Sequence, residues 1–291
     1  GSPCDSVRPT PYRTIAYGEL LIEGLPAPLG TVVQALNPSG DVVGCFEVEQ
    51  AGEYGYLQIF GEDPPDIPGM AEGEIVEFRV NGVPVLAEPS LYWTDDQDLH
   101  QVDLALESTK AQCSWLRPDW NLISFAPQPP VPVVEHVLRS IDGRYCRVLG
   151  EDGVYDCDLD PVYRTLKELD PGSAYYLRLE GGVGANLRVI GVPIPVTTPL
   201  SLHEHWNWVG YLPTTTLPIT TALQSIDGQY LLVHSRDATF NPGDPLHSTL
   251  WEMEPGQGYL IRATEPLTLT YPAGPAPDRA ALSASTLSGC D

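Results

Sequence analysis

Two stretches of this chain repeat one pattern: residues 165–179 read TLKELDPGSAYYLRL, and residues 249–263 read TLWEMEPGQGYLIRA. They begin 249 − 165 = 84 residues apart. In each stretch an acid-Pro-Gly turn leads into a run that alternates along the chain, which predicts a turn followed by a half-buried strand. The repetition therefore predicts a β-rich module that occurs twice.

Two further motifs recur in the same order and extend the repeat. WNLISFAP begins at Trp120 and WNWVGYLP begins at Trp206, an offset of 206 − 120 = 86 residues. LRSIDGRY contains Ile141 and LQSIDGQY contains Ile226, an offset of 226 − 141 = 85 residues. Offsets that drift by single residues indicate duplication with small loop deletions.

Each copy is expected to open with a strand and to continue with a short helix, a hairpin and a final strand pair. The helix is predicted because Val134, Val137, Leu138 and Ile141 recur at helical spacing. A second helical turn is expected at TLKEL, residues 165–169. One unit of this size buries only a modest core, so we expect the two copies to pack together about a pseudo-twofold axis.

The duplicated part resembles tandem modules of secreted and surface-anchored bacterial proteins that start GWNLVS and end PGxGYWI. Here the openings are DWNLISF and HWNWVGY, the endings are PGSAYYL and PGQGYLI, and the match covers residues 119–271. The first copy departs from the pattern at Ala174, which replaces glycine. The resemblance implies extracellular architecture and attachment, and no catalytic residue comes with it.

Residues 10–110 contain short apolar runs separated by turn residues, which is typical of a β-sandwich. Asn81-Gly82 is a strong signal for a two-residue hairpin turn, and NPSGD at residues 37–41 marks a second hairpin. The stretches GELLIEGLPAPLGTVVQA, GCFEVEQAGEYGYLQIFGED and VEFRVNGVPV resemble carboxypeptidase-regulatory-like and prealbumin-like sandwiches. This resemblance implies a fold rather than an activity.

The expected fold is mainly β, with an N-terminal sandwich followed by a duplicated β-rich module with short helices. The expected parts are an N-terminal sandwich, a first module, a second module and a flexible tail rich in Pro, Ala and Ser. Their boundaries are residues 1–112, 113–200, 201–272 and 273–291.

The chain is strongly acidic, with 15 Lys and Arg against 39 Asp and Glu and a net charge of −24. Such a charge disfavours nucleic acid as a partner, because phosphate contacts require cations. No run approaches the roughly 20 apolar residues of a membrane helix, so membrane insertion is not expected. The first residues, GSPCDSVRP, lack the pattern of a signal peptide, so we expect any signal to have been removed or left out.

Six cysteines are present, and none has the spacing of a zinc site. Cys146 and Cys157 lie symmetrically about a turn at Glu151-Asp152, so a hairpin there places them opposite each other. We expect a disulfide between them rather than two free thiols, and with it an extracytoplasmic location. The sequence leaves the pairing of the other four open: Cys4, Cys45, Cys113 and Cys290.

Repeated aromatic residues suggest either a sugar-stacking platform or core packing, and core packing is the preferred interpretation. The residues concerned are Trp120, Trp206, Trp208, Trp251, Tyr175 and Tyr259. Trp251 is the exception, because its counterpart in the first copy is Lys167 and the position is therefore expected to face water. Trp251 is the candidate ligand-binding residue.

Two acidic runs are candidates for calcium binding, since calcium requires six to eight oxygen ligands that converge on one point. The candidate ligands are Glu62, Asp63 and Asp66 in GEDPPD, and Asp95, Asp96 and Asp98 in TDDQD. Neither run has EF-hand spacing, so solvated acidic loops are the alternative. A third group around the proposed disulfide, at residues 151–158, is equally ambiguous.

No motif for catalysis is present. The chain has no GxSxG elbow, no phosphate-binding loop and no dinucleotide-binding glycine motif, and HEH at residues 203–205 lacks HExxH spacing. We therefore expect a non-enzymatic extracellular protein of a bacterial surface, with a structural or adhesive role and a glycan or surface protein as partner. The alternatives are a subunit of a homopolymeric fibre, joined by strand addition or terminal disulfides, and a carboxylate-dependent glycan hydrolase.

Overall fold

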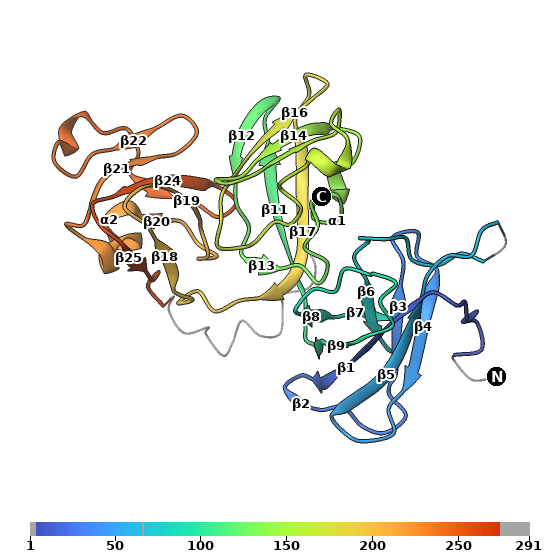
Figure 1. Cartoon of the computed structure of the whole chain (residues 1–291). Coiled ribbons are helices and arrows are strands. Elements are labelled where there is room, and N and C mark those ends of the chain that lie inside the picture. Colours follow the sequence, from blue (N-terminus) through green and yellow to red (C-terminus); the bar gives the residue numbers. More distant parts are fainter. Residues whose placement is uncertain (1–3, 66, 274–291) are drawn as a thin grey trace. The chain divides into compact units, whose positions relative to one another are not determined.

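The computed structural model describes residues 4–65 and 67–273, and the chain divides into two compact units, Gly1–Ser108 and Thr109–Asp291. The fold is mainly β, as predicted from the sequence (Figure 1). Among the described residues, no helix has both the length and the apolar character needed to span a membrane. The tail predicted at residues 273–291 lies, apart from Ala273, outside the described residues.

The first unit contains two sheets. In the first, the strand order is β2-β1-β10-β8, and β5 and β9 also pair with β1. These strands are β1 (Arg13–Ile22), β2 (Leu25–Pro26), β5 (Glu53–Phe60), β8 (Leu86–Glu88), β9 (Leu99–Gln101) and β10 (Asp103–Leu106). In the second sheet, the order is β4-β3-β6-β7. Its strands are β3 (Val32–Leu36), β4 (Val42–Glu47), β6 (Glu77–Val80) and β7 (Val83–Pro84).

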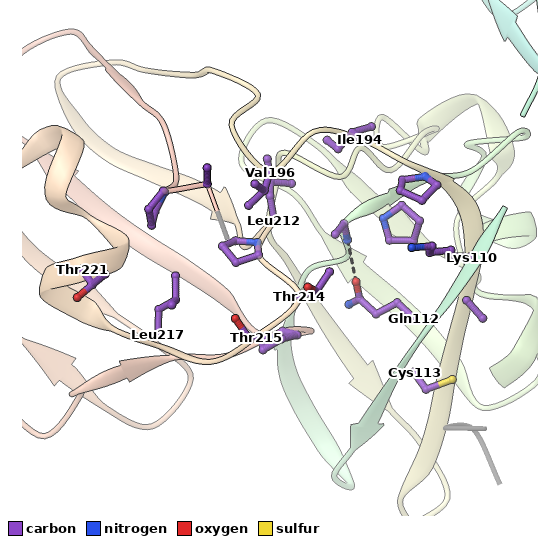
Figure 2. Close-up of a pocket in the computed structure, with 18 residues that line it drawn as sticks. Lys110, Gln112, Cys113, Ile194, Val196, Leu212, Thr214, Thr215, Leu217 and Thr221 are labelled. Carbon is purple, nitrogen blue, oxygen red and sulfur yellow. Dashed lines mark hydrogen bonds between the residues drawn. The ribbon is translucent and has the colours of Figure 1, made fainter. Parts of the chain in front are cut away.

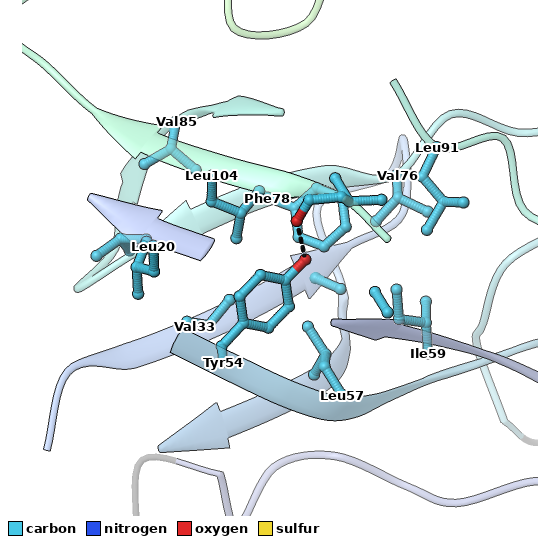
Figure 3. Packing of buried hydrophobic residues seen from close by; sticks show 14 of the residues in the cluster. Leu20, Val33, Tyr54, Leu57, Ile59, Val76, Phe78, Val85, Leu91 and Leu104 are labelled. Atoms are coloured by element: carbon cyan, nitrogen blue, oxygen red, sulfur yellow. Dashed lines mark hydrogen bonds between the residues drawn. The ribbon is translucent and has the colours of Figure 1, made fainter. Parts of the chain in front are cut away.

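The two sheets share one apolar core, which Figure 3 shows from close by. Alternate residues of β1 are buried, as expected for a strand with one face on the core. Tyr54 of β5 is also buried, and its hydroxyl donates to the Val102 carbonyl over 2.7 Å. This bond satisfies the one polar group that the ring carries into the core.

Both predicted hairpin turns are present in the first unit. Asn81 and Gly82 have positive φ angles of 49° and 81° between β6 and β7, as a type I′ turn requires. In the turn between β3 and β4, Asn37 Oδ1 accepts the Asp41 N–H over 2.9 Å, and Gly40 has a φ of 89°.

The second unit contains both copies of the repeat. In the first copy, a four-stranded sheet has the order β12-β16-β14-β15, and a second sheet has the order β11-β17-β13. The strands are β11 (Lys110–Leu116), β12 (Asp119–Ile123), β13 (Pro127–Gln128), β14 (Tyr145–Leu149), β15 (Val154–Asp156), β16 (Tyr175–Leu179) and β17 (Ala185–Pro193).

The second copy has a four-stranded sheet of the same connectivity, in the order β19-β24-β21-β22. Two further pairs are β18-β25 and β20-β23. The strands are β18 (Leu200–Leu202), β19 (His205–Gly210), β20 (Leu217–Pro218), β21 (Tyr230–His234), β22 (Thr239–Phe240), β23 (Glu252–Met253), β24 (Gly258–Ala263) and β25 (Leu267–Leu269). The shared order of the two four-stranded sheets is the structural counterpart of the sequence repeat.

A short helix follows the opening strand of each copy. These helices are α1 (Val134–Val137) with η1 (Arg139–Ile141), and α2 (Ile219–Ala222) with η3 (Gln224–Ile226). The four apolar residues that predict the first helix are all buried in the core of the first copy. The helical segments end at Asp142 and Asp227, whose backbone is extended with ψ of 142° and 134°, and each is followed by a glycine with positive φ, Gly143 at 70° and Gly228 at 75°.

The helical turn predicted at residues 165–169 is wrong. Each copy instead has a 3-10 turn just before this stretch: η2 (Pro161–Tyr163) precedes residues 165–169, and η4 (Pro245–His247) precedes the equivalent residues 249–253. Residues 165–169 are extended because their backbone groups bond to other segments: the Leu166 N–H donates to Val154, and the Lys167 carbonyl accepts from Val134. These bonds replace the i to i−4 bonds of a helix.

Candidate functional site

The two copies meet through a reciprocal contact within the second unit. The Ser124 N–H donates to the Gly256 carbonyl over 3.1 Å, and the Gly210 N–H donates to the Gly172 carbonyl over 3.0 Å. Ser124 and Gly210 are equivalent positions of the repeat, and so are Gly172 and Gly256. An exchange of equivalent bonds is what a twofold relation between the copies requires.

Two small residues face each other in this contact. Ala174 and Gly258 are equivalent in the repeat, and both are buried. A Cβ atom built on Gly258 would lie 2.6 Å from the Ala174 Cβ and 2.7 Å from the Ile123 carbonyl oxygen. The contact therefore holds the Ala174 methyl group but has no room for a methyl group at position 258, where both Ala174 and the Ile123 backbone would be in the way.

The hairpin turn of each copy also contacts the other copy. Glu151, in the turn between β14 and β15, binds His203 Nε2 over 2.5 Å and accepts the Trp208 N–H over 2.9 Å. In the second copy, Asp237 of the equivalent turn pairs with Arg117 over 2.7 Å. Arg117 and His203 are equivalent positions of the repeat. In each copy, an acidic residue of the hairpin turn therefore contacts a basic side chain of the other copy.

A pocket of about 580 Å³ lies between the two copies (Figure 2). This volume is in the range of ordinary ligand pockets, which is roughly 300–1,000 Å³. Its walls are mainly Pro, Thr and aliphatic residues. The first copy contributes Lys110 to Cys113, the link between copies contributes Ile194 and Val196, and the second copy contributes Leu212 to Thr215. Among the described residues of this lining, Lys110 is the only charged one.

Strand β11 forms one wall of the pocket and is held in place by Gln112. The Gln112 side chain accepts the Ala126 N–H over 2.9 Å and donates to the Ser124 carbonyl over 3.3 Å. Among the described strands, β11 pairs with β17 alone, so it is an edge strand of its sheet. An edge strand beside an apolar pocket can accept an extended peptide.

The cysteines stabilise both units. Cys146 and Cys157 form a disulfide with a Cα–Cα distance of 4.9 Å, and the hairpin register around it is the one that the sequence symmetry predicts. Cys4 is joined to Cys45, with a Cα–Cα distance of 5.2 Å. Cys113 is disulfide-bonded as well, and Cys290 lies outside the described residues.

A possible metal-binding group surrounds the hairpin disulfide. The ligand atoms of Cys146, Asp156, Cys157 and Asp158 lie within 4.8 Å of one another. However, the two sulfur atoms are joined to each other, and metal binding requires thiolates. Asp156 accepts from Arg147 Nε over 2.8 Å, and this bond and the one from the Asp158 N–H hold the pKa of Asp156 below its usual value. In the disulfide form, the group therefore offers only carboxylate oxygens.

The side chains of the run Asp95, Asp96 and Asp98 are partly engaged by the protein. Asp95 accepts the Arg13 N–H over 3.0 Å. Burial alone would raise the pKa of Asp96, but bonds from the Asp98 N–H, Thr94, His100 and Thr14 lower it to about 2. The Asp96 carboxylate thus acts as an acceptor that fixes this loop against β1.

The first acidic run lies on an exposed loop. Glu62 and Asp63 are exposed, and Asp66 lies outside the described residues. Within the described part of the chain, neither run forms a group of three acids with converging ligand atoms. Calcium binding at these runs stays a prediction.

The aromatic residues of the repeat divide into two classes. Tyr175 and Tyr259 are buried, and their hydroxyls accept the N–H of Asp170 and Glu254, each over 2.7 Å. Burial raises the pKa of Tyr175 to about 12. These two rings therefore belong to the cores.

The tryptophans are more accessible. Trp120, Trp206 and Trp208 are half-buried, and the Trp208 ring stands edge-on to Tyr176 with 5.2 Å between centroids. Trp251 is 53% exposed, as its counterpart Lys167 predicts, and it contacts the edge of Phe240. Trp251 is not one of the described residues that line the pocket.

Sequence reasoning missed the pocket between the copies. Its walls include Ile194, Val196 and Leu212, which lie in the runs IPVTTP and LPTTTLP. Runs of Pro and Thr between strands are typical of surface loops. The aliphatic residues inside these runs could have indicated a buried surface, because a loop that is fully exposed to solvent does not need them. A comparison with known protein families finds no match to the chain, and a comparison with curated proteins finds none either.

Proposed function

We propose that this is a non-enzymatic extracellular protein with a structural or adhesive role, and that it holds an apolar polypeptide segment in the pocket between its two repeated modules. The observation that carries the proposal is the 580 Å³ pocket, which is lined by residues of both copies and of the link between them. Apolar walls with few polar groups favour an apolar partner.

An extracellular location is supported by the disulfides Cys4–Cys45 and Cys146–Cys157, since such bonds persist in oxidising compartments. The resemblance of the repeat to surface-protein modules supports the same location. The net charge of −24 agrees with a protein that neither binds nucleic acid nor adheres to anionic membranes.

The pocket favours a polypeptide over a glycan. None of the described residues that line it is Trp, Tyr or Phe, and sugar rings are usually held by stacking on such side chains. The part of the lining that the structure describes contains no carboxylate either, so these residues do not supply the acid pair of a glycan hydrolase. The adjacent edge strand β11 offers backbone groups to an extended peptide.

The test is binding of a phage-displayed library of ten-residue peptides to the purified protein. Thr214→Trp, which fills the pocket, is compared with Trp251→Ala, which leaves the pocket intact. We expect apolar peptides whose binding Thr214→Trp removes and Trp251→Ala preserves. Selected peptides that bind both variants equally would contradict the proposal, and so would the absence of binders to a protein whose pocket is open.

A second candidate is a homopolymeric fibre joined by strand addition, which the edge position of β11 favours. A terminal disulfide through Cys4 is no longer part of this candidate, because Cys4 is bonded to Cys45 within the chain. Light scattering of the purified protein at increasing concentration tests it. A constant monomer mass argues against a fibre.

Glycan binding by Trp251 is the remaining candidate, since this ring is 53% exposed. Isothermal titration against neutral polysaccharides, with Trp251→Ala as the control, tests it directly. Heat that persists in the variant would assign the glycan to another surface.

A further inference from the structure

The described chain ends in the wall of the pocket between the copies. Tyr271 is fully buried in the core of the second copy, and its hydroxyl donates to the Gly210 carbonyl over 2.9 Å. Pro272 and Ala273, which follow it, both line the pocket. The segment that continues from Ala273 therefore starts at the pocket itself.

The lining of the pocket also contains a bonded cysteine. Cys113 of β11 lines the pocket and is disulfide-bonded. The chain has six cysteines, of which four form the bonds Cys4–Cys45 and Cys146–Cys157. Cys290 is the one cysteine that remains as a partner within the chain. Figure 2 shows Cys113 beside Gln112 and across the view from Thr221.

We propose that the pocket is the docking site of the chain's own C-terminal segment, residues 274–291, and that a Cys113–Cys290 disulfide holds this segment there. This inference rests on the proposed function, which assigns the pocket to a polypeptide segment, and it adds which segment occupies the pocket. When the bond forms, two S–H bonds break and one S–S bond forms. Two electrons and two protons pass to a disulfide oxidant, which becomes a dithiol.

The segment has the length and the composition for this site. From Ala273 to Cys290 there are 290 − 273 = 17 residues, which reach about 55–60 Å when fully extended. A pocket of 580 Å³ is about 8 Å across, taken as the cube root, so the segment can cross it with ample slack. Its sequence, GPAPDRAALSASTLSGCD, carries Leu282 and Leu287 among small residues, which suits walls of Pro, Thr and aliphatic side chains.

Two measurements on the full chain test the bond and the docking separately. Trypsin cleaves after Lys110, Arg139 and Arg279, so non-reducing digestion should give peptide 111–139 linked to peptide 280–291. The linked species should disappear on reduction and in Cys290→Ser. Absence of this species from the unreduced wild-type protein overturns the proposal.

Docking is read with the apolar dye 8-anilinonaphthalene-1-sulfonate. The pair Leu282→Asp and Leu287→Asp should free the pocket and raise dye fluorescence several-fold. The matched pair Ser283→Asp and Ser288→Asp adds the same charge and should leave it unchanged. Equal fluorescence from the two double variants overturns the docking.

Mass under non-reducing conditions distinguishes the source of the segment. We expect the linked peptides to come from protein that migrates as a monomer. If they come only from dimers or longer ladders, the segment belongs to a second copy, and docking within one chain is wrong. Failure of the peptide library to bind the Leu282→Asp and Leu287→Asp variant would instead count against the proposed function, because that variant has an open pocket.

Discussion

Gly258 shows how a single methyl group is controlled where the two copies meet. Its equivalent in the first copy is Ala174, and the two positions lie so close that a Cβ atom on Gly258 would be 2.6 Å from the Ala174 Cβ. Interiors packed at this density do not absorb an added atom without shifting backbone or side chains. With alanine at position 174 in the first copy, the second copy therefore needs glycine at position 258.

Gly258→Ala is expected to destabilise the second unit by about 1–3 kcal/mol, the usual cost of overpacking. Urea unfolding followed by tryptophan fluorescence measures this change. Adding Ala174→Gly should restore part of the loss, because it removes one clash but leaves the Ile123 carbonyl 2.7 Å from the new Cβ. If Gly258→Ala unfolds at the wild-type midpoint, the contact is not as tight as described.

His205 occupies a position that favours glycine. Its φ angle is 84°, which lies in the left-handed region that favours glycine. A left-handed conformation costs a residue with a Cβ atom about 1–2 kcal/mol. Glycine avoids this cost, but its greater conformational freedom in the unfolded chain offsets part of the resulting gain in stability. The His205 ion pair with Glu204 spans 3.9 Å on the surface and contributes little.

His205→Gly should therefore stabilise the second unit by about 0.5 kcal/mol. His205→Ala is the matched control, because it removes the imidazole but keeps the Cβ atom. Thermal unfolding of the two variants side by side gives the comparison. A gain shared by both variants would show that the imidazole, and not the backbone conformation, is unfavourable.

The hairpin of β14 and β15 is the element in which sequence and structure agree most closely. The symmetric spacing of Cys146 and Cys157 about the turn predicts their register, and the structure pairs Arg147 with Asp156 in that register. The prediction works because side-chain position along a ladder follows from counting alone. The helical turn predicted at residues 165–169 failed because its local pattern does not reveal that Val134 and Val154 bond to it from other parts of the chain.

Replacing Cys146 and Cys157 together by Ser should lower the free energy of unfolding of the second unit by about 2–3 kcal/mol. The bond closes a loop with a sequence separation of 11 residues, and a loop of this size gives that value from chain entropy. The first unit, which keeps Cys4–Cys45, provides an internal reference in the same denaturation experiment. An unchanged second transition would mean that the hairpin's hydrogen bonds suffice without the disulfide.

At the scale of the whole molecule, the duplication was visible in the sequence and the pocket was not. The offsets between motifs define two equivalent modules, and their reciprocal bonds through Ser124 and Gly210 follow from a twofold relation. The pocket arises where this symmetry is incomplete, at the link containing Ile194 and Val196, which occurs once in the chain. A repeat in the sequence reveals only what the two copies share. The link has no counterpart, so the repeat gives no information about it.

The coupling of the two copies is expected to depend on pH through His203. Its Nδ1 binds the Glu204 carbonyl over 2.7 Å and its Nε2 binds Glu151, and these bonds, with the charge of Asp152 nearby, raise the pKa of His203 above its usual value. Because the pKa of His203 is higher in the folded than in the unfolded chain, protonation of His203 stabilises the fold. This contribution is fully present below a pH of about 6.5, the pKa of histidine in the unfolded chain. The contribution is lost as pH rises through the higher folded value.

The second unit should therefore unfold at a higher temperature at pH 6 than at pH 9, by a margin that shrinks in Glu151→Gln. Asp237→Asn is the matched control, because the equivalent contact of Asp237 is with Arg117, which keeps its charge throughout this range. Thermal unfolding of the three proteins across this range measures the dependence. An Asp237→Asn protein that loses the pH dependence while Glu151→Gln keeps it would assign the titration to a group other than His203.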